Sequence, residues 1–129
     1  MKRRNTRLEP VSVLLTRRAL ADIREIDRYS TKEWGRKTAE QYLDAIQAAL
    51  DRLPENPELL RLEPDFSPSL YFYRVRKHFL VCDYREKTVC VLAVIHTSMD
   101  VPARLNELEP RLAMEADYLH RKLHRESIK

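Results

Sequence analysis

Apolar residues near the start of the chain recur at helical spacing in two successive segments. The first segment predicts a helix that begins after Thr16 as its N-cap and ends between residues 30 and 35, because its apolar positions are three residues apart: Leu20, Ile23 and Ile26. The second predicts a helix with a capping box formed by Thr38 and Gln41, followed by one apolar stripe: Ala39, Tyr42, Leu43, Ile46, Ala49, Leu50 and Leu53. The pattern therefore indicates a helical hairpin. We expect Trp34 to fill the gap between its two helices.

The pattern then changes from helical spacing to alternation. Residues 11–15 are apolar enough for a short first strand, whereas prolines at 54, 57, 64 and 68 predict a loop. Residues 71–75 alternate as a strand does, and residues 79–84 and 88–96 form a predicted β-hairpin. Positions 89–95 of the last strand are all apolar, which is typical of a strand covered on both faces.

The tail continues with a further helical pattern. Its apolar positions recur at intervals of three or four: Leu105, Leu108, Leu112, Ala116, Leu119 and Leu123. Pro110 suits the first turn of a helix, so the pattern predicts a helix from about Pro110 to Arg125. We expect this helix to cover the sheet face that the hairpin leaves bare, and an interface with a partner is the alternative.

Length and charge limit the broad class of protein. A chain of 129 residues with 43% hydrophobic residues is consistent with one domain, residues 1–129. The net charge of +4 includes a basic segment at residues 1–10, which we expect to be flexible and which lacks the apolar stretch of a secretory signal. No apolar run is long enough to span a membrane, so we expect a cytoplasmic protein. Its two cysteines, Cys82 and Cys90, are then expected to be buried thiols, with a disulfide between them as the minor alternative.

Known chemical motifs are absent from the sequence. It contains no phosphate-binding glycine loop, no nucleophile elbow and no CxxC pair. His120 and His124 lie four residues apart on one predicted helix face, but no third ligand stands at a convincing spacing. We therefore expect no metal and no cofactor.

The stretch LYFYRVRKHFLVCDYREKTVCVLAVIHTSMDVP, residues 70–102, is the most informative part of the chain. Together with Ala19–Ile23, Tyr29, Trp34–Gly35, Ala39 and Tyr42 in the helical hairpin, it resembles the ParE branch of the RelE/ParE toxins over residues 11–102. The resemblance implies an α+β fold, in which a two-helix hairpin packs on a small antiparallel sheet, with residues 103–129 as a helical C-terminal extension. It also implies the toxin of a type II toxin–antitoxin module that inhibits DNA gyrase, is not itself an enzyme, and is neutralised by a ParD-like antitoxin. A homo-oligomer, or a hetero-oligomer with the antitoxin, is compatible with it, and the tail is a candidate interface for either.

Two other functions stay open. A RelE-like, ribosome-dependent messenger RNA endoribonuclease needs a base, cations and an acid. The candidates for those roles are Arg74, His78, Tyr84, Arg85 and His96, although strand alternation divides them between two faces. An interaction domain with the same fold and no toxicity is the third possibility.

A second set of residues is predicted to bind the antitoxin or the target: Arg74, Arg76, His96, Met99 and Asp100. Arg74 has the alternative role of pairing with Asp100 inside the fold. His96 ends a buried strand beside a turn, and we favour an anchoring role over that of a catalytic base.

Overall fold

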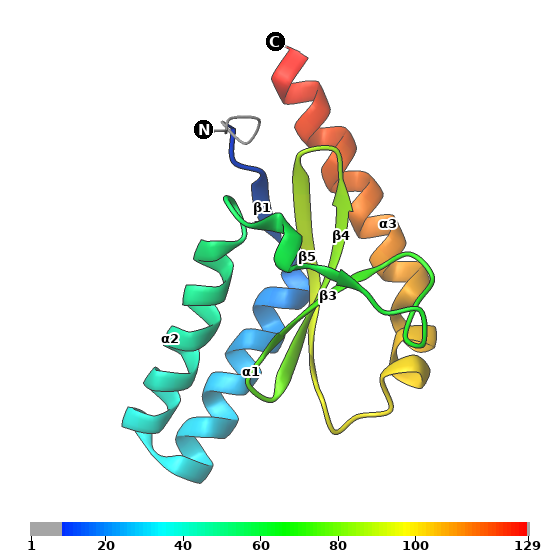
Figure 1. The fold of residues 1–129 in the computed structure, drawn as a ribbon. Coiled ribbons are helices and arrows are strands. Elements are labelled where there is room, and N and C mark those ends of the chain that lie inside the picture. Colours follow the sequence, from blue (N-terminus) through cyan, green and yellow to red (C-terminus); the bar gives the residue numbers. More distant parts are fainter. Residues whose placement is uncertain (1–8, 129) are drawn as a thin grey trace.

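The computed structural model describes the backbone of residues 9–128 and the side chains of residues 9–108 and 110–122, so most of the basic N-terminal segment lies outside the described residues. Three α-helices and five strands make up this part of the chain (Figure 1). In chain order the elements are β1 (Ser12–Leu15), α1 (Arg17–Trp34), α2 (Arg36–Arg52), a 3₁₀ helix (Pro57–Leu59), β2 (Arg61–Leu62), β3 (Tyr71–Val75), β4 (His78–Arg85), β5 (Thr88–His96) and α3 (Val101–Ile128).

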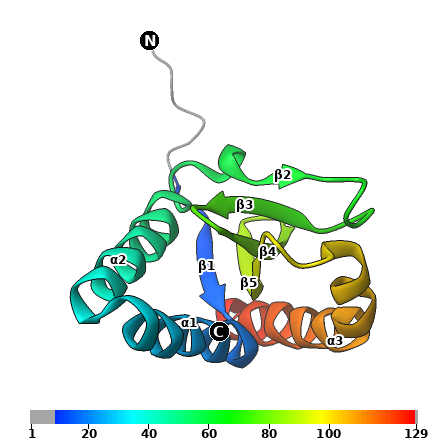
Figure 2. The same ribbon diagram turned by 90° about the horizontal axis from the view of Figure 1, so that it is seen from below.

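The strands form one five-stranded sheet in the order β1-β5-β4-β3-β2. Helices α1 and α2 cover one face and α3 covers the other (Figure 2). The α+β architecture is confirmed, but the sheet is mixed, because β1 runs parallel to β5 while every other pair is antiparallel. Parallel neighbours need a long connection, and the segment between β1 and β5 contains most of the fold. The proline-rich segment predicted as a loop supplies β2, which pairs with β3 at the sheet edge.

The hairpin of α1 and α2 turns on a single residue. Thr16 caps α1, as predicted, by accepting a hydrogen bond from the Ala19 amide. Gly35, at φ 92°, ends α1 and also precedes the first residue of α2. The predicted capping box of Thr38 is therefore wrong, because Thr38 already lies inside the helix. The prediction for Trp34 is also wrong: its side chain is 66% exposed, because the one-residue turn leaves the ring outside the contact between the helices.

Two apolar clusters lie on opposite faces of the sheet. The first contains the α2 stripe and the sheet residues that face it, among them Ile46, Leu53, Leu80 and Val91. The second is formed by α3 and the opposite sheet face, and its buried residues from α3 are Val101, Leu105, Leu108, Leu112 and Ala116. The all-apolar run in β5 is thus covered on both faces, as its sequence predicts.

Helix α3 docks on the sheet as expected, but its predicted start is wrong. The helix begins at Val101, and Pro110 lies within it. Asp100 accepts a hydrogen bond from the Ala103 amide and so caps the helix nine residues earlier than the sequence pattern suggested. Pro102 then occupies the first turn, the position that had been assigned to Pro110. The side chain of Leu123 lies outside the described residues.

A β-bulge in β5 changes which side chains face the hairpin. Val81 pairs with Ala93 while Cys82 pairs with Val91, so Leu92 has no partner on β4. Leu92 and Ala93 consequently both belong to the cluster under α3. After the bulge, Val94 faces the hairpin, and the alternation resumes one residue out of phase.

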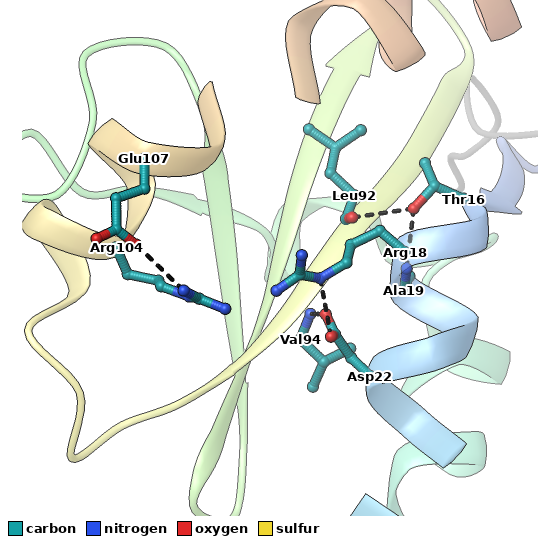
Figure 3. Close-up of polar contacts among 8 residues, drawn as sticks. All are labelled: Thr16, Arg18, Ala19, Asp22, Leu92, Val94, Arg104 and Glu107. Carbon is teal, nitrogen blue, oxygen red and sulfur yellow. Dashed lines mark hydrogen bonds and ion pairs between the residues drawn. The ribbon is translucent and has the colours of Figure 1, made fainter. Parts of the chain in front are cut away.

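The backbone at the bulge is bonded by side chains of α1 (Figure 3). The Thr16 hydroxyl donates to the Leu92 carbonyl at 2.9 Å, and the Asp22 carboxylate accepts from the Val94 amide at 2.9 Å. These side chains bond two backbone groups of β5 that a neighbouring strand would otherwise bond, since β1 pairs with β5 only as far as Val91.

The two cysteines are buried free thiols, as predicted. Cys82 belongs to the cluster under the hairpin and Cys90 to the cluster under α3, so their side chains point to opposite faces of the sheet. Burial raises the pKa of both thiols, that of Cys90 to about 11. No helix in the described part of the chain is long and apolar enough to cross a membrane.

Candidate functional site

A cluster of polar side chains lies at the end of the sheet where β3 turns into β4 and where β5 finishes. The side chain of Tyr42 reaches this end from α2. Its hydroxyl accepts a hydrogen bond from the Lys77 amide at 3.0 Å and lies 2.6 Å from Nδ1 of His78. We call Tyr42, Arg76, His78 and His96 the histidine cluster.

The two histidines of the cluster are stacked edge to face. The ring centroids of His78 and His96 are 4.9 Å apart with an interplanar angle of 78°. Burial, and to a smaller extent the neighbouring His96, lower the pKa of His78 to about 4. His78 is therefore neutral near pH 7. A neutral imidazole carries one ring proton, so Nδ1 of His78 accepts the Tyr42 proton in one tautomer and donates to the Tyr42 oxygen in the other.

His96 is held by the turn that follows it. The Ser98 amide donates to Nδ1 of His96 at 3.0 Å, and the Met99 amide donates to the His96 carbonyl. A ring nitrogen that accepts an amide proton is less available as a catalytic base. This geometry favours the anchoring role that the sequence suggested.

The turn between β3 and β4 carries two of the predicted binding residues. Arg76 has φ 53°, a conformation that is uncommon for residues other than glycine, and its guanidinium lies 5.7 Å from the centre of the Tyr42 ring. Nε of Arg74 donates to the Arg76 carbonyl at 2.8 Å and so supports the turn. The predicted pairing of Arg74 with Asp100 is not found among the described residues, where Arg74 supports this turn instead.

Met99 and Asp100 differ in what they offer a partner. The Met99 side chain is 48% exposed, which is high for a large apolar residue and suits a binding surface. The Asp100 side chain caps α3 instead. Of the five predicted binding residues, Arg74, His96 and Asp100 thus make structural hydrogen bonds through their side chains, whereas Arg76 contacts the Tyr42 ring and Met99 is exposed.

The structure separates the residues predicted for a nuclease. Arg74, His78 and His96 lie at the end of the sheet just described, whereas Tyr84 and Arg85 lie at the opposite end of β4. Tyr84 packs edge to face on Tyr71. The two groups therefore do not form one site.

Arg85 belongs to an ion-pair network that fastens α3 to β4. It donates to Asp83 at 2.9 Å and to Asp117 at 2.6 Å, and the hydrogen bond to Asp117 raises the Arg85 pKa. His120 lies 2.8 Å from Asp83. His120 thus has a structural partner, while the side chain of His124 lies outside the described residues. The described residues contain no cluster of three or more side chains suited to a metal.

Tyr42 is the member of the histidine cluster that sequence reasoning missed. Its position in the apolar stripe of α2 was read as packing only. A signal was present, because a tyrosine hydroxyl within a buried stripe requires a hydrogen-bond partner, and such a partner lies on another element.

Comparisons with known proteins agree with this fold. The family model described as "ParE toxin of type II toxin-antitoxin system, parDE" matches residues 13–101. The chain is 30% identical to Toxin ParE of Escherichia coli over 93 residues, which cover 71% of this chain and 90% of that protein. It is 36% identical to Toxin ParE1 of Mycobacterium tuberculosis over 95 residues, covering 71% and 95% of the two chains.

A solved structure shows the same fold. It is described as the chromosomal ParDE TA system from P. aeruginosa, and it superposes with a TM-score of 0.61 at 17% identity. The match covers 68% of this chain and 97% of that one. The family model ends at Val101, the first residue of α3, so nearly all of this helix lies outside the shared region.

Proposed function

The chain belongs to the ParE toxin family of type II toxin–antitoxin systems, and we propose that it acts by binding and inhibiting DNA gyrase. The family match includes β1, the helical hairpin and every strand of the sheet, so it contains the whole histidine cluster. Gyrase works on chromosomal DNA, and the proposed site of action is therefore the cytoplasm.

The observation that carries this proposal is that the residues predicted for a nuclease lie near two opposite ends of β4. His78 is the first residue of β4 and Arg85 is the last of its eight residues. At about 3.3 Å per residue these positions are roughly 23 Å apart. A general base, an acid and the cations that stabilise one phosphorane must all lie within hydrogen-bonding reach of it. The separation supports an inhibitor that binds its target over a RelE-like nuclease.

We assign the contact with gyrase to the end of the sheet that holds the histidine cluster. The side chains of Arg74 and Arg76 are exposed there, and Met99 presents an apolar side chain beside them. Basic groups around an apolar contact suit an acidic protein surface. The rigid turn at Arg76 reduces the entropy lost when such a contact forms.

A ParD-like antitoxin is the proposed neutralising partner, and the complex with it is then a hetero-oligomer. An antitoxin that covers the same end of the sheet would compete directly with the target. Arg74→Glu should weaken that complex by about 1–3 kcal/mol if the arginine is desolvated in it. Unchanged affinity in calorimetry, with the melting temperature preserved, would remove Arg74 from the antitoxin interface.

The target is tested with the purified full chain, DNA gyrase and relaxed plasmid. We expect loss of supercoiling or accumulation of cleaved plasmid, and Arg76→Glu should reduce this effect. The matched control is Arg24→Glu, because Arg24 is exposed on α1 and has no ion pair among the described residues. If the chain leaves gyrase unaffected and instead cuts ribosome-bound messenger RNA, the RelE-like function replaces the proposed one.

A further inference from the structure

The outer edge of β5 has no neighbouring strand beyond the end of β1 among the described residues. Strand β1 pairs with Thr88–Val91, so the edge from Leu92 to His96 has no strand beside it. Helices α1 and α3 cover the two faces of β5 and leave this edge between their first turns (Figure 3).

Two arginines extend past this edge of β5 from the helices on opposite faces of the sheet. We call the space between their guanidinium groups the gap. Arg18 comes from the first turn of α1 and Arg104 from the first turn of α3, and in Figure 3 their guanidinium groups point toward each other. Each side chain is only 35% exposed. Both guanidinium groups are thus partly shielded from water, and an anion placed between them would be attracted by two positive charges.

Each arginine is fixed through one nitrogen. Nε of Arg18 donates to Asp22 at 2.9 Å, and Asp22 is itself fixed by the Val94 amide. Nη1 of Arg104 donates to Glu107 at 3.1 Å. Within the described residues, both Nη atoms of Arg18 and the Nε and Nη2 atoms of Arg104 have no hydrogen-bond partner. The planar groups are thus oriented in advance, with donors left for a ligand.

The charges near the gap indicate the kind of anion. Arg18 and Arg104 are balanced by Asp22 and Glu107, so the four side chains sum to zero. Glu107 is 67% exposed, and solvent screens its charge more than that of Asp22. A group with one negative charge fits this balance better than a phosphate with two. Its oxygens can accept from both arginines at once.

We propose that Arg18 and Arg104 form a binding site for one carboxylate of an acidic polypeptide. Under the proposed function, on which the identity of the partner rests, this polypeptide is the antitoxin. The site lies on α1 and α3, apart from the histidine cluster that we assign to gyrase. A partner segment that reaches both surfaces is anchored between Arg18 and Arg104 while it covers the histidine cluster.

The site is tested without any antitoxin, with a terminally blocked hexaglutamate peptide as the probe. In protein labelled with ¹⁵N, the peptide should shift the Nε–H resonances of Arg18 and Arg104. Arg104→Gln should weaken peptide binding about tenfold or more, the loss expected for hydrogen bonds to a charged group. Arg24→Gln removes an exposed arginine of α1 outside the gap and should change affinity by less than about twofold.

Three further readouts make the test decisive. Arg104→Gln should melt close to the wild type, because the ion pair with Glu107 that it removes is largely exposed to solvent. Inorganic phosphate at the same concentration should shift the two resonances less than the peptide does, whereas a larger shift would reassign the site to phosphate. Equal weakening by Arg24→Gln, or no shift of the two resonances, would overturn the proposal. Neither result depends on gyrase, so a failure here is distinct from a failure of the proposed function.

Discussion

The hydroxyl of Tyr42 on α2 lies 2.6 Å from Nδ1 of His78 on β4 and accepts the amide proton of Lys77, so one side chain ties the helical hairpin to the turn of the sheet. Tyr42→Phe keeps the ring but leaves both partners without their bond. We expect a loss of about 1–3 kcal/mol in the free energy of unfolding, measured by urea denaturation.

The control for this substitution is Tyr73→Phe. Tyr73 is also partly buried beneath the hairpin, and no hydrogen bond of its hydroxyl occurs among the described residues. This variant should stay within about 0.5 kcal/mol of the wild type. Equal losses in the two variants would mean that the Tyr42 bond contributes nothing specific to stability.

Protonation of His78 should destabilise the fold in mild acid. Its pKa is lowered from 6.5 to about 4 in the folded protein, so the unfolded chain takes up the proton first as the pH falls. The stability contributed by the neutral ring is complete above pH 6.5 and is lost between pH 6.5 and about 4. Because the side chain is only partly buried, solvent screening reduces this contribution to about 1–2 kcal/mol.

The measurement compares unfolding free energies of the wild type and His78→Asn from pH 7.5 to 4.5. The asparagine oxygen can accept the Tyr42 hydroxyl proton but does not titrate. The wild type should lose stability over this range by about 1–2 kcal/mol more than the variant. Parallel curves would assign the acid sensitivity to carboxylates elsewhere.

Substitutions of Arg76, which lies in a turn at φ 53°, can distinguish an effect on binding from an effect on folding. Glycine adopts φ 53° without steric cost, and this relief offsets the loss of the contact with the Tyr42 ring. Arg76→Gly should therefore change stability by less than about 1 kcal/mol while it reduces gyrase inhibition. Arg76→Val, whose branched side chain disfavours this φ, should unfold more easily. A glycine variant that inhibits gyrase fully would exclude the Arg76 side chain from the interface.

Helix α3 should be a structural part of the domain even though it lies outside the family model. Leu105 of this helix is 1% exposed, and Leu105→Ala should lower the free energy of unfolding by about 2–5 kcal/mol. Met114 is 71% exposed on the same helix, and Met114→Ala should cost less than about 0.5 kcal/mol. The two melting temperatures, recorded by circular dichroism, check the difference. Similar melting temperatures would indicate that α3 is not stably docked.

The fold was largely predictable because its apolar patterns agree with the elements they form. The apolar stripe of α2 is buried only when the helix packs against a sheet. The continuous apolar run of β5 is buried only when helices cover both faces of the strand. The start of α3 was not predictable from its stripe. An aspartate cap at Asp100 followed by Pro102 is as good a start as Pro110, and only packing of Val101 and Leu105 decides between them.

The histidine cluster was only partly predictable. His78, His96 and Arg76 were recognised as candidates, but strict alternation gives no reason for His96 to share a face with His78. The bulge at Leu92 supplies that reason, because the residues after it face the opposite way from the one that counting predicts. Tyr42 comes from another element, and its partner depends on how the hairpin packs on the sheet.

The same bulge determines which change in chain length the histidine cluster should tolerate. Leu92 is the residue of β5 that has no partner on β4, so deletion of its codon would remove the bulge and leave the pairs on either side of it unchanged, including that of His78 with His96. Among descendants of this gene, a homologue that keeps both histidines but is one residue shorter between Cys90 and His96 should therefore lack the bulge and keep their contact.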